Sequence, residues 1–191
     1  MARLPYPDLK DLSPENRDLM ASLPPLNVFR MMSGAGASFA PFMQFISAYL
    51  NEGVLDPELR ELVILRVGHL CGSAYEVHQH ERVSRTLGMT EARIQAVKDM
   101  LPNDLLSDAE NTALLFADEQ VAQVKVSETT FTATHKHFTD PQIVELTIIV
   151  GTYLMVCRFL ETLEIELEET DIDGSGLEEI EASVKSLNGG E

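Results

Sequence analysis

The chain has 191 residues, 45% hydrophobic and 24% charged, which is ordinary for one folded domain with a substantial core. Its formal net charge is −17, and the segment Glu161–Glu191 contributes −10 of this, from eleven acidic residues and one basic residue. This balance excludes nucleic acids and anionic membranes as expected partners, because both are bound through clustered Lys and Arg. We expect a folded domain over residues 1–168 and a solvated acidic tail over 169–191.

The N-terminal fifty residues predict short helices divided by proline and glycine. The start of the chain, up to Leu12, is Pro-rich and expected to be extended, and Ser13-Pro14 is typical of a helix N-terminus. Pro24-Pro25 and the run Ser33–Gly36, expected to be flexible, break the helical pattern. We predict helices over 14–22, 26–32 and 39–50. The last of these carries residues interpreted as core: Phe42, Phe45, Ile46 and Tyr49.

The span from Asp56 to Gly88 has the clearest helical pattern. Asp56 suits an N-cap, Pro57 suits the first helical position, and Gly88 can take the left-handed conformation that ends a helix. A break at Gly72-Ser73 would fold the second arm back on the first. The apolar residues expected to supply the core are Leu59, Leu62, Val63, Leu65, Val67 and Leu70.

Three titratable residues interrupt this apolar pattern and are the candidate site. Glu76 and His80 are four positions apart, so on a helix they stand one turn above each other and can exchange a proton or hydrogen bond. If the chain folds back near Gly72, Glu61 on the first arm faces that pair. We therefore predict a Glu61/Glu76/His80 cluster.

The remaining chain predicts four more helices, over the ranges 90–100, 107–124, 127–137 and from 141 onward. The nearly apolar run Ile143–Leu160 contains Glu145 and Arg158, so we interpret it as a buried helix and not as a membrane span. Residues 143–150 echo residues 59–66, which suggests two related helical halves. In that alignment Ser73, Glu76 and His80 correspond to Cys157, Leu160 and Glu164.

The histidines do not predict a metal site. His78 and His80, like His135 and His137, are two positions apart, so on a helix they point to nearly opposite sides and cannot share one ion. The stretch Glu169–Gly174 resembles the opening of a calcium loop, but Ile180 stands where the bidentate Glu belongs. We expect no metal and no calcium site.

Two cysteines, Cys71 and Cys157, are too few for a disulfide framework, and no basic leader with an apolar signal core stands at the N-terminus. We therefore expect a cytoplasmic protein. The two thiols can approach each other if the two helical halves pack face to face, but we interpret them as buried core thiols.

The residues of the central span resemble the carboxymuconolactone decarboxylase family, whose fold is shared with alkylhydroperoxidase D-like proteins. The resemblance is carried by Arg60-Glu61-Leu62, by Tyr75–His80 and by Leu87–Thr90. It matches Glu61 and His80 to the family's helix glutamate and histidine. Glu76 matches a Tyr-Glu-Trp-x-x-His variant of the decarboxylase-like branch, with Val77 in place of the Trp.

The resemblance implies an all-α, single-domain helical bundle of about eight helices and a homo-oligomer, trimer or hexamer. It also separates this chain from the peroxidase branch, whose Cys-x-x-Cys pair falls at Ser73 and Glu76 and whose second histidine falls at Tyr75. Such a peroxidase needs one thiolate to attack the peroxide and a second cysteine to resolve the product, so we predict no peroxidase turnover.

The chemistry that remains is acid–base decarboxylation of a small carboxylated or lactone substrate, for which no cofactor is needed. In this hypothesis His80 donates or shuttles the proton, Glu76 orients it or joins the relay, and Glu61 holds the network. Two alternatives stay open: the cluster is a structural ion-pair network, or the chain is a non-catalytic small-molecule-binding module. The expected substrate contacts are Tyr75, Ser73 and Arg66, with Arg60, Arg82 and Arg85 as other cationic anchors or surface charges.

Overall fold

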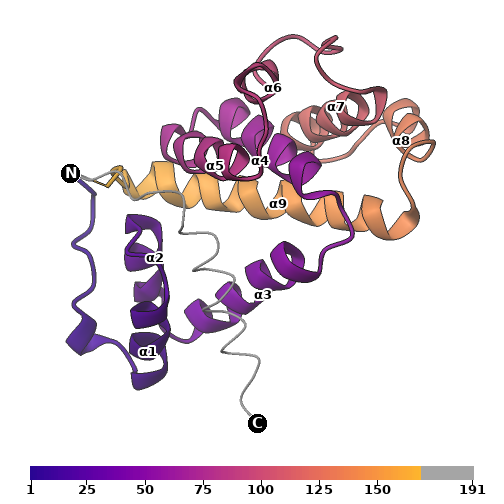
Figure 1. Cartoon of the computed structure of the whole chain (residues 1–191). Coiled ribbons are helices and arrows are strands. Elements are labelled where there is room, and N and C mark those ends of the chain that lie inside the picture. Colours follow the sequence, from indigo (N-terminus) through magenta and orange to yellow (C-terminus); the bar gives the residue numbers. More distant parts are fainter. Residues whose placement is uncertain (169–191) are drawn as a thin grey trace. The chain divides into compact units, whose positions relative to one another are not determined.

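The computed structural model describes residues 1–168, and every regular element in that range is a helix (Figure 1). The prediction of an all-α chain is confirmed for these residues. The predicted acidic tail and the calcium-loop-like stretch lie outside the described residues, so the domain boundary after residue 168 stays a prediction. The described residues form two compact units: Met1–Gly53 with the residues from Leu163 onward, and Val54–Thr162.

The first unit contains short helices around a small apolar core. Ser13 Oγ accepts a hydrogen bond from the Asn16 amide at 3.2 Å, so the predicted N-cap is confirmed. Phe39 and Met43 are buried, whereas Phe45 is 44% exposed and its assignment to the core was wrong. The elements are η1 (Leu9–Asp11), α1 (Pro14–Ser22), α2 (Asn27–Met32), η2 (Ser33–Ser38) and α3 (Phe39–Glu52).

The run Ser33–Gly36 was expected to be flexible, but it lies within the 3-10 helix η2. Gly36 has a φ of 62°, a left-handed value that a residue with a side chain rarely adopts. The carbonyl of Gly36 accepts a hydrogen bond at 2.8 Å from the buried side chain of Asn16. A glycine turn held by a buried side chain therefore replaces the expected flexible linker.

The second unit is organised around helix α4, whose middle is buried. Every residue from Leu59 to Gly68 is buried, because α5 and α7 pack against α4 (Figure 1). Leu70, however, is 43% exposed, so its assignment to the core was wrong. The elements are α4 (Pro57–Cys71), α5 (Ala74–Thr86), α6 (Glu91–Ala96), α7 (Asp108–Gln123), α8 (Glu128–Thr134) and α9 (Asp140–Leu163).

The predicted ends of these helices are largely confirmed. Asp56 Oδ1 accepts hydrogen bonds from the amides of Glu58 and Leu59, and Gly88 has a φ of 88° just after α5. Ser107 and Glu110 form a reciprocal capping box at the start of α7. Two helices are shorter than predicted: α6 ends at Ala96 and α8 at Thr134, each followed by turns.

Helix α9 repeats the buried apolar positions of α4, but its glutamate has different partners. Leu146, Ile149 and Val150 are buried like their counterparts in α4, whereas Glu145, at the position of Glu61, accepts hydrogen bonds from the Val54 and Leu55 amides. By length and composition α9 is able to cross a membrane, but half of its apolar window is buried inside the protein, as in a core helix. Its other face is exposed, so the predicted buried helix is only half buried.

Candidate active site

A glycine reversal between α4 and α5 places the candidate residues. Gly72 adopts a left-handed conformation, with φ 67° and ψ 23°, and the Ser73 amide donates to the Gly68 carbonyl at 3.0 Å. The predicted break at Gly72-Ser73 is thus confirmed. Gly68 also permits close packing of the two arms, since a Cβ at this position would lie 3.1 Å from Val77 Cγ2 on α5. The second arm therefore runs back along the first.

This reversal brings Glu61, Glu76 and His80 together. His80 Nδ1 lies 2.6 Å from Glu61 Oε2, and His80 Nε2 lies 2.9 Å from Glu76 Oε1. Glu61 is fully buried and Glu76 is 4% exposed, while the His80 side chain keeps 14% exposure. One imidazole thus lies between two buried carboxylates, with each ring nitrogen facing one of them.

The carboxylates determine the charge of His80. Burial alone lowers the pKa of His80, but the charges of Glu61 and Glu76 and their hydrogen bonds outweigh it and raise the pKa to about 10. At neutral pH the ring is therefore an imidazolium that donates from both nitrogens. The sequence alone could not decide between desolvation and ion pairing, because the distance between Glu61 and His80 depends on the fold.

Two further residues adjoin the cluster. The ring of Tyr153 on α9 meets the His80 ring edge-on, with the centroids 5.0 Å apart and the planes at 90°. Arg60 Nε lies 3.5 Å from Glu61 Oε1, and its side chain is 8% exposed, so Arg60 is not the surface charge that was one of its expected roles. Tyr153 was not predictable from the sequence, because only the packing of α9 brings its ring to His80.

Arg66, one of the predicted substrate contacts, is held by other parts of the second unit. Its guanidinium donates to both carboxylate oxygens of Asp118, at 2.6 and 2.7 Å, and to the carbonyls of Val97 and Asp99. These bonds tie α4 to α7 and to the segment after α6. Arg66 thus has a packing role, and its role as a substrate contact stays a prediction.

The other two predicted substrate contacts are buried. Ser73 is 0% exposed and Tyr75 is 4% exposed. Ser73 Oγ has no nitrogen or oxygen partner among the described residues and lies beside the thiol of Cys157, a weak hydrogen-bonding group. Their roles as substrate contacts stay a prediction.

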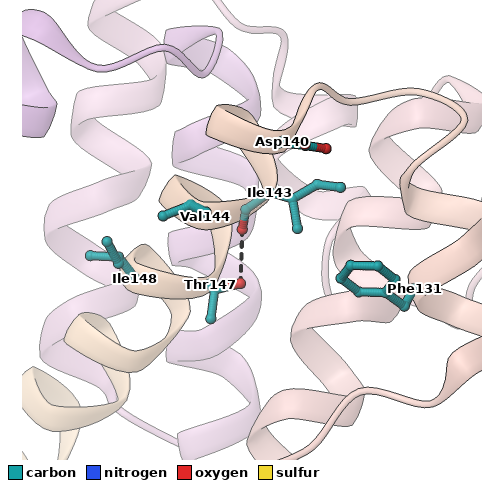
Figure 2. Close-up of a pocket in the computed structure, with 6 residues that line it drawn as sticks. All are labelled: Phe131, Asp140, Ile143, Val144, Thr147 and Ile148. Carbon is teal, nitrogen blue, oxygen red and sulfur yellow. Dashed lines mark hydrogen bonds between the residues drawn. The ribbon is translucent and has the colours of Figure 1, made fainter.

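An apolar pocket of about 340 Å³ lies between α8 and the first turns of α9. Figure 2 shows Phe131 of α8 on one side and Ile143 and Thr147 of α9 on the other. Glu61, Glu76 and His80 do not line this pocket, so its position does not identify a substrate site at the cluster. The lining residues are Phe131, Asp140, Ile143, Val144, Thr147 and Ile148.

Within residues 1–168, no three or more His, Cys, Asp or Glu side chains are grouped so that they could hold a metal ion. The cluster is instead closed by internal hydrogen bonds, since both nitrogens of His80 face carboxylate oxygens. The chemistry that this arrangement can perform is proton transfer.

Comparisons with known proteins agree with the resemblance read from the sequence. Residues 37–119 match the model of the carboxymuconolactone decarboxylase family. The uncharacterized protein YdfG of Bacillus subtilis (strain 168) is 24% identical over 111 residues, which cover 57% of this chain and 76% of that protein.

Solved structures show the same fold. The alkylhydroperoxidase AhpD core of an uncharacterized peroxidase-related protein from Ralstonia eutropha superposes with a TM-score of 0.76 at 22% identity, covering 88% of this chain and 93% of that one. A complex of the debrominase Bmp8 with 2,3,4-tribromopyrrole superposes with a TM-score of 0.65 at 15% identity, covering 98% of this chain and 100% of the other. The chain therefore has the fold of alkylhydroperoxidase D-like proteins, and its residues 37–119, which include Glu61, Glu76 and His80, are similar to the carboxymuconolactone decarboxylase family.

Proposed function

We propose that this protein is a cofactor-independent lyase that removes CO2 from a small carboxylated or lactone substrate, with His80 as the proton donor. The observation that carries the proposal is a charged imidazole held between two buried carboxylates. Loss of CO2 leaves an electron pair that the substrate's own conjugated carbonyl accepts. The protein then has to supply a proton to carbon, which an imidazolium does.

The two contacts of His80 suit different tasks. Glu61 is fully buried and makes the shorter contact, 2.6 Å to Nδ1, so it fixes the orientation of the ring. Glu76 lies in the first turn of α5 and makes the longer contact, 2.9 Å to Nε2. We assign proton delivery to Nε2, the ring nitrogen that contacts Glu76.

Glu76 controls how readily the proton leaves. A pKa of about 10 makes His80 a weak acid at neutral pH, where the best general acids have a pKa near the working pH. When substrate draws Glu76 away from Nε2, only the charge and the hydrogen bond of Glu61 remain to raise the pKa of His80. The pKa of His80 then falls. The imidazolium then becomes a stronger acid at the moment when the substrate is bound.

The proposal is tested by offering the protein carboxylated unsaturated lactones in deuterated water and measuring CO2 release and deuterium at the product carbon. Matched saturated lactone acids serve as controls, because they lack the conjugated carbonyl that accepts the electron pair. We expect CO2 and carbon-bound deuterium from unsaturated substrates only. Absence of CO2 from every unsaturated lactone, or equal rates for both classes, contradicts the proposal.

A structural role for the cluster is the competing proposal, and the complete burial of Glu61 favours it. In that account Glu61 pairs with His80 only to hold α5 against α4, and Glu76 pairs with His80 within α5. The two accounts differ for a His80→Ala variant that still folds. The structural account predicts a less stable protein whose activity per folded molecule is unchanged, whereas the lyase account predicts lost activity.

A thiol peroxidase is a second alternative, because a solved relative is described as peroxidase-related. The sequence disfavours this alternative, because Ser73 and Glu76 occupy the positions of the Cys-x-x-Cys pair. Burial also raises the pKa of both Cys71 and Cys157, which disfavours the thiolate that attacks a peroxide. A steady loss of hydroperoxide with a dithiol donor would favour this alternative, and Cys71→Ser would show whether Cys71 carries it.

We further propose that the protein is a cytoplasmic homo-oligomer. The exposed face of α9 supports self-association, because Val144, Ile148 and Met155 are 58%, 41% and 42% exposed and are spaced at four and seven residues. Gly151 lies between Ile148 and Met155 on the same face with open space above it, which allows another helix to approach closely. A second copy of this face is the partner that we assign to it.

A further inference from the structure

Glu61 has a second cationic neighbour besides His80. Its carboxylate uses one oxygen for each, since Oε2 lies 2.6 Å from His80 Nδ1 and Oε1 lies 3.5 Å from Arg60 Nε. The side chain of Arg60 is 8% exposed, and arginine is almost never buried without a partner. Adjacent side chains on a helix do not face each other, so the Arg60 side chain turns toward Glu61 along α4 to make this contact.

Four charged groups with little exposure therefore alternate in sign through successive contacts. The order is Arg60, Glu61, His80 and Glu76, and each neighbouring pair in this order is within ion-pair distance. Two cations and two anions leave the cluster without net charge. This balance matters because an uncompensated charge costs far more in a buried site than in water.

Loss of the His80 proton disturbs this balance. Once the ring is neutral, two carboxylates face the single positive charge of Arg60, so the cluster carries one excess negative charge. Without Arg60 it would carry two. The charge of Arg60 therefore stabilises the state that remains after the proton has left, and it lowers the proton affinity of His80.

We propose that Arg60 is a positioning residue for the proton transfer assigned to His80: it pairs with the Glu61 oxygen that does not contact His80 and offsets its charge, so that His80 releases the proton more readily. Arg60 contacts no reacting atom in this account. Its part in catalysis rests on the proposed lyase function. Its effect on the His80 proton does not, and that effect is measurable without substrate.

The other neighbours of His80 come from three helices. Glu61 on α4 and Glu76 on α5 hold the proton on the ring and raise the pKa of His80 to about 10, and Tyr153 on α9 meets the ring edge-on. Arg60 acts in the opposite direction to the two carboxylates. Removing its charge should therefore leave His80 protonated to a higher pH.

The test measures the protonated fraction of His80 at pH 10, near the pKa of the ring, by NMR of the imidazole nitrogens. The chain has five histidines, and the His80 signals are identified by their absence in His80→Gln. Wild type should be about half protonated. Arg60→Gln should have a proton affinity about tenfold higher, whereas Arg60→Lys, which keeps the charge, should stay close to wild type.

The matched control is Arg66→Gln. Arg66 lies on the same helix and its side chain is 10% exposed, but its carboxylate partner is Asp118. Its replacement should lower the free energy of unfolding without changing the protonated fraction of His80. A purely structural Arg60 predicts the same pattern for Arg60→Gln, so lost stability with an unchanged or smaller protonated fraction overturns the proposal.

A second pair of variants decides the question if Arg60→Gln does not fold, which circular dichroism reveals. In this pair Glu61→Gln is compared with the double variant Arg60→Gln/Glu61→Gln. The double variant should hold the His80 proton more tightly, because it lacks the positive charge that Glu61→Gln keeps. Equal or lower proton affinity in the double variant contradicts the proposal.

Rates of CO2 release separate this inference from the lyase function. On a lactone acid that wild type decarboxylates, Arg60→Gln should be slower and Arg60→Lys should recover most of the rate. If wild type releases no CO2 but Arg60→Gln holds the His80 proton more tightly, the lyase function fails and the effect of Arg60 on the cluster stands. If wild type releases CO2 and the proton affinity is unchanged, the lyase function stands and the role of Arg60 is wrong.

Discussion

His80 Nδ1 lies 2.6 Å from Glu61 Oε2, a contact that joins the middle of α5 to the first half of α4 across the Gly72 reversal. This contact joins residues nineteen positions apart, its acceptor is buried, and its donor keeps only 14% side-chain exposure. The charge of the ring, the packing of the two arms and the proposed proton transfer all depend on it.

The raised pKa of His80 predicts that the protein loses stability in alkaline solution. The folded-state pKa is about 10, against about 6.5 for an unfolded chain, so the folded state holds the proton more tightly. The stabilisation is complete below about pH 6.5 and is lost as the pH rises through about 10. Urea unfolding across this window should show a decrease on the order of a few kcal/mol in wild type.

The control for this alkaline loss is His80→Gln, which removes the titrating ring. Its free energy of unfolding should lack the part of the pH dependence that belongs to His80. Identical pH profiles for wild type and His80→Gln contradict the assignment.

Removing Glu61 should be far more costly than removing a surface carboxylate. Glu61→Ala leaves the His80 imidazolium with one buried partner in place of two, and we expect a loss of about 3–5 kcal/mol in the free energy of unfolding. The control is Glu91→Ala on α6, whose side chain is 60% exposed and whose partner Arg85 is 43% exposed, with a far smaller expected loss. If urea unfolding shows similar losses of unfolding free energy for both variants, the claim of a buried ionic cluster is wrong.

Gly72 and Gly151 should respond in opposite directions to replacement by alanine. Gly72 has a φ of 67°, which a side chain strains, so Gly72→Ala should destabilise the protein by about 1 kcal/mol. A Cβ on Gly151, inside α9, meets no atom within 4 Å, so Gly151→Ala should stabilise the isolated chain by up to about 1 kcal/mol. Thermal unfolding measures both, and a neutral Gly72→Ala would show that the reversal is not conformationally demanding.

The exposed face of α9 should control the oligomeric state. Ile148→Glu places a charge among apolar side chains that a second copy is proposed to cover, so light scattering should show a smaller assembly than wild type. Leu105→Glu makes the same change at an exposed leucine outside α9 and should leave the mass unchanged. A wild-type monomer, or an Ile148→Glu assembly of wild-type mass, argues against this face.

Local signals in the sequence predicted the helices and the reversal because each is determined by neighbouring residues. The Asp56 cap, the left-handed Gly72 and Gly88, and the Ser107–Glu110 capping box need only a few adjacent positions. The approach of Glu61 to His80 was predictable from the same local signals, because a break at Gly72 lets the second helix fold back along the first.

Contacts between distant segments were not predictable in this way. Helical periodicity shows which residues share a face but not what covers that face, which is why Leu70 and Phe45 were wrongly placed in the core. Arg66 looked available for substrate because Asp118, its partner, is fifty-two positions away. The contact of Tyr153 with His80 was likewise not predictable, because these residues are far apart in the sequence.

The most direct measurement of the central claim is the rate of CO2 release by His80→Ala compared with wild type, on any unsaturated lactone acid that wild type decarboxylates, with folding verified by circular dichroism. We expect the variant to lose about 10²-fold or more of the rate, the usual contribution of a general acid. A folded His80→Ala variant that releases CO2 as fast as wild type contradicts the account.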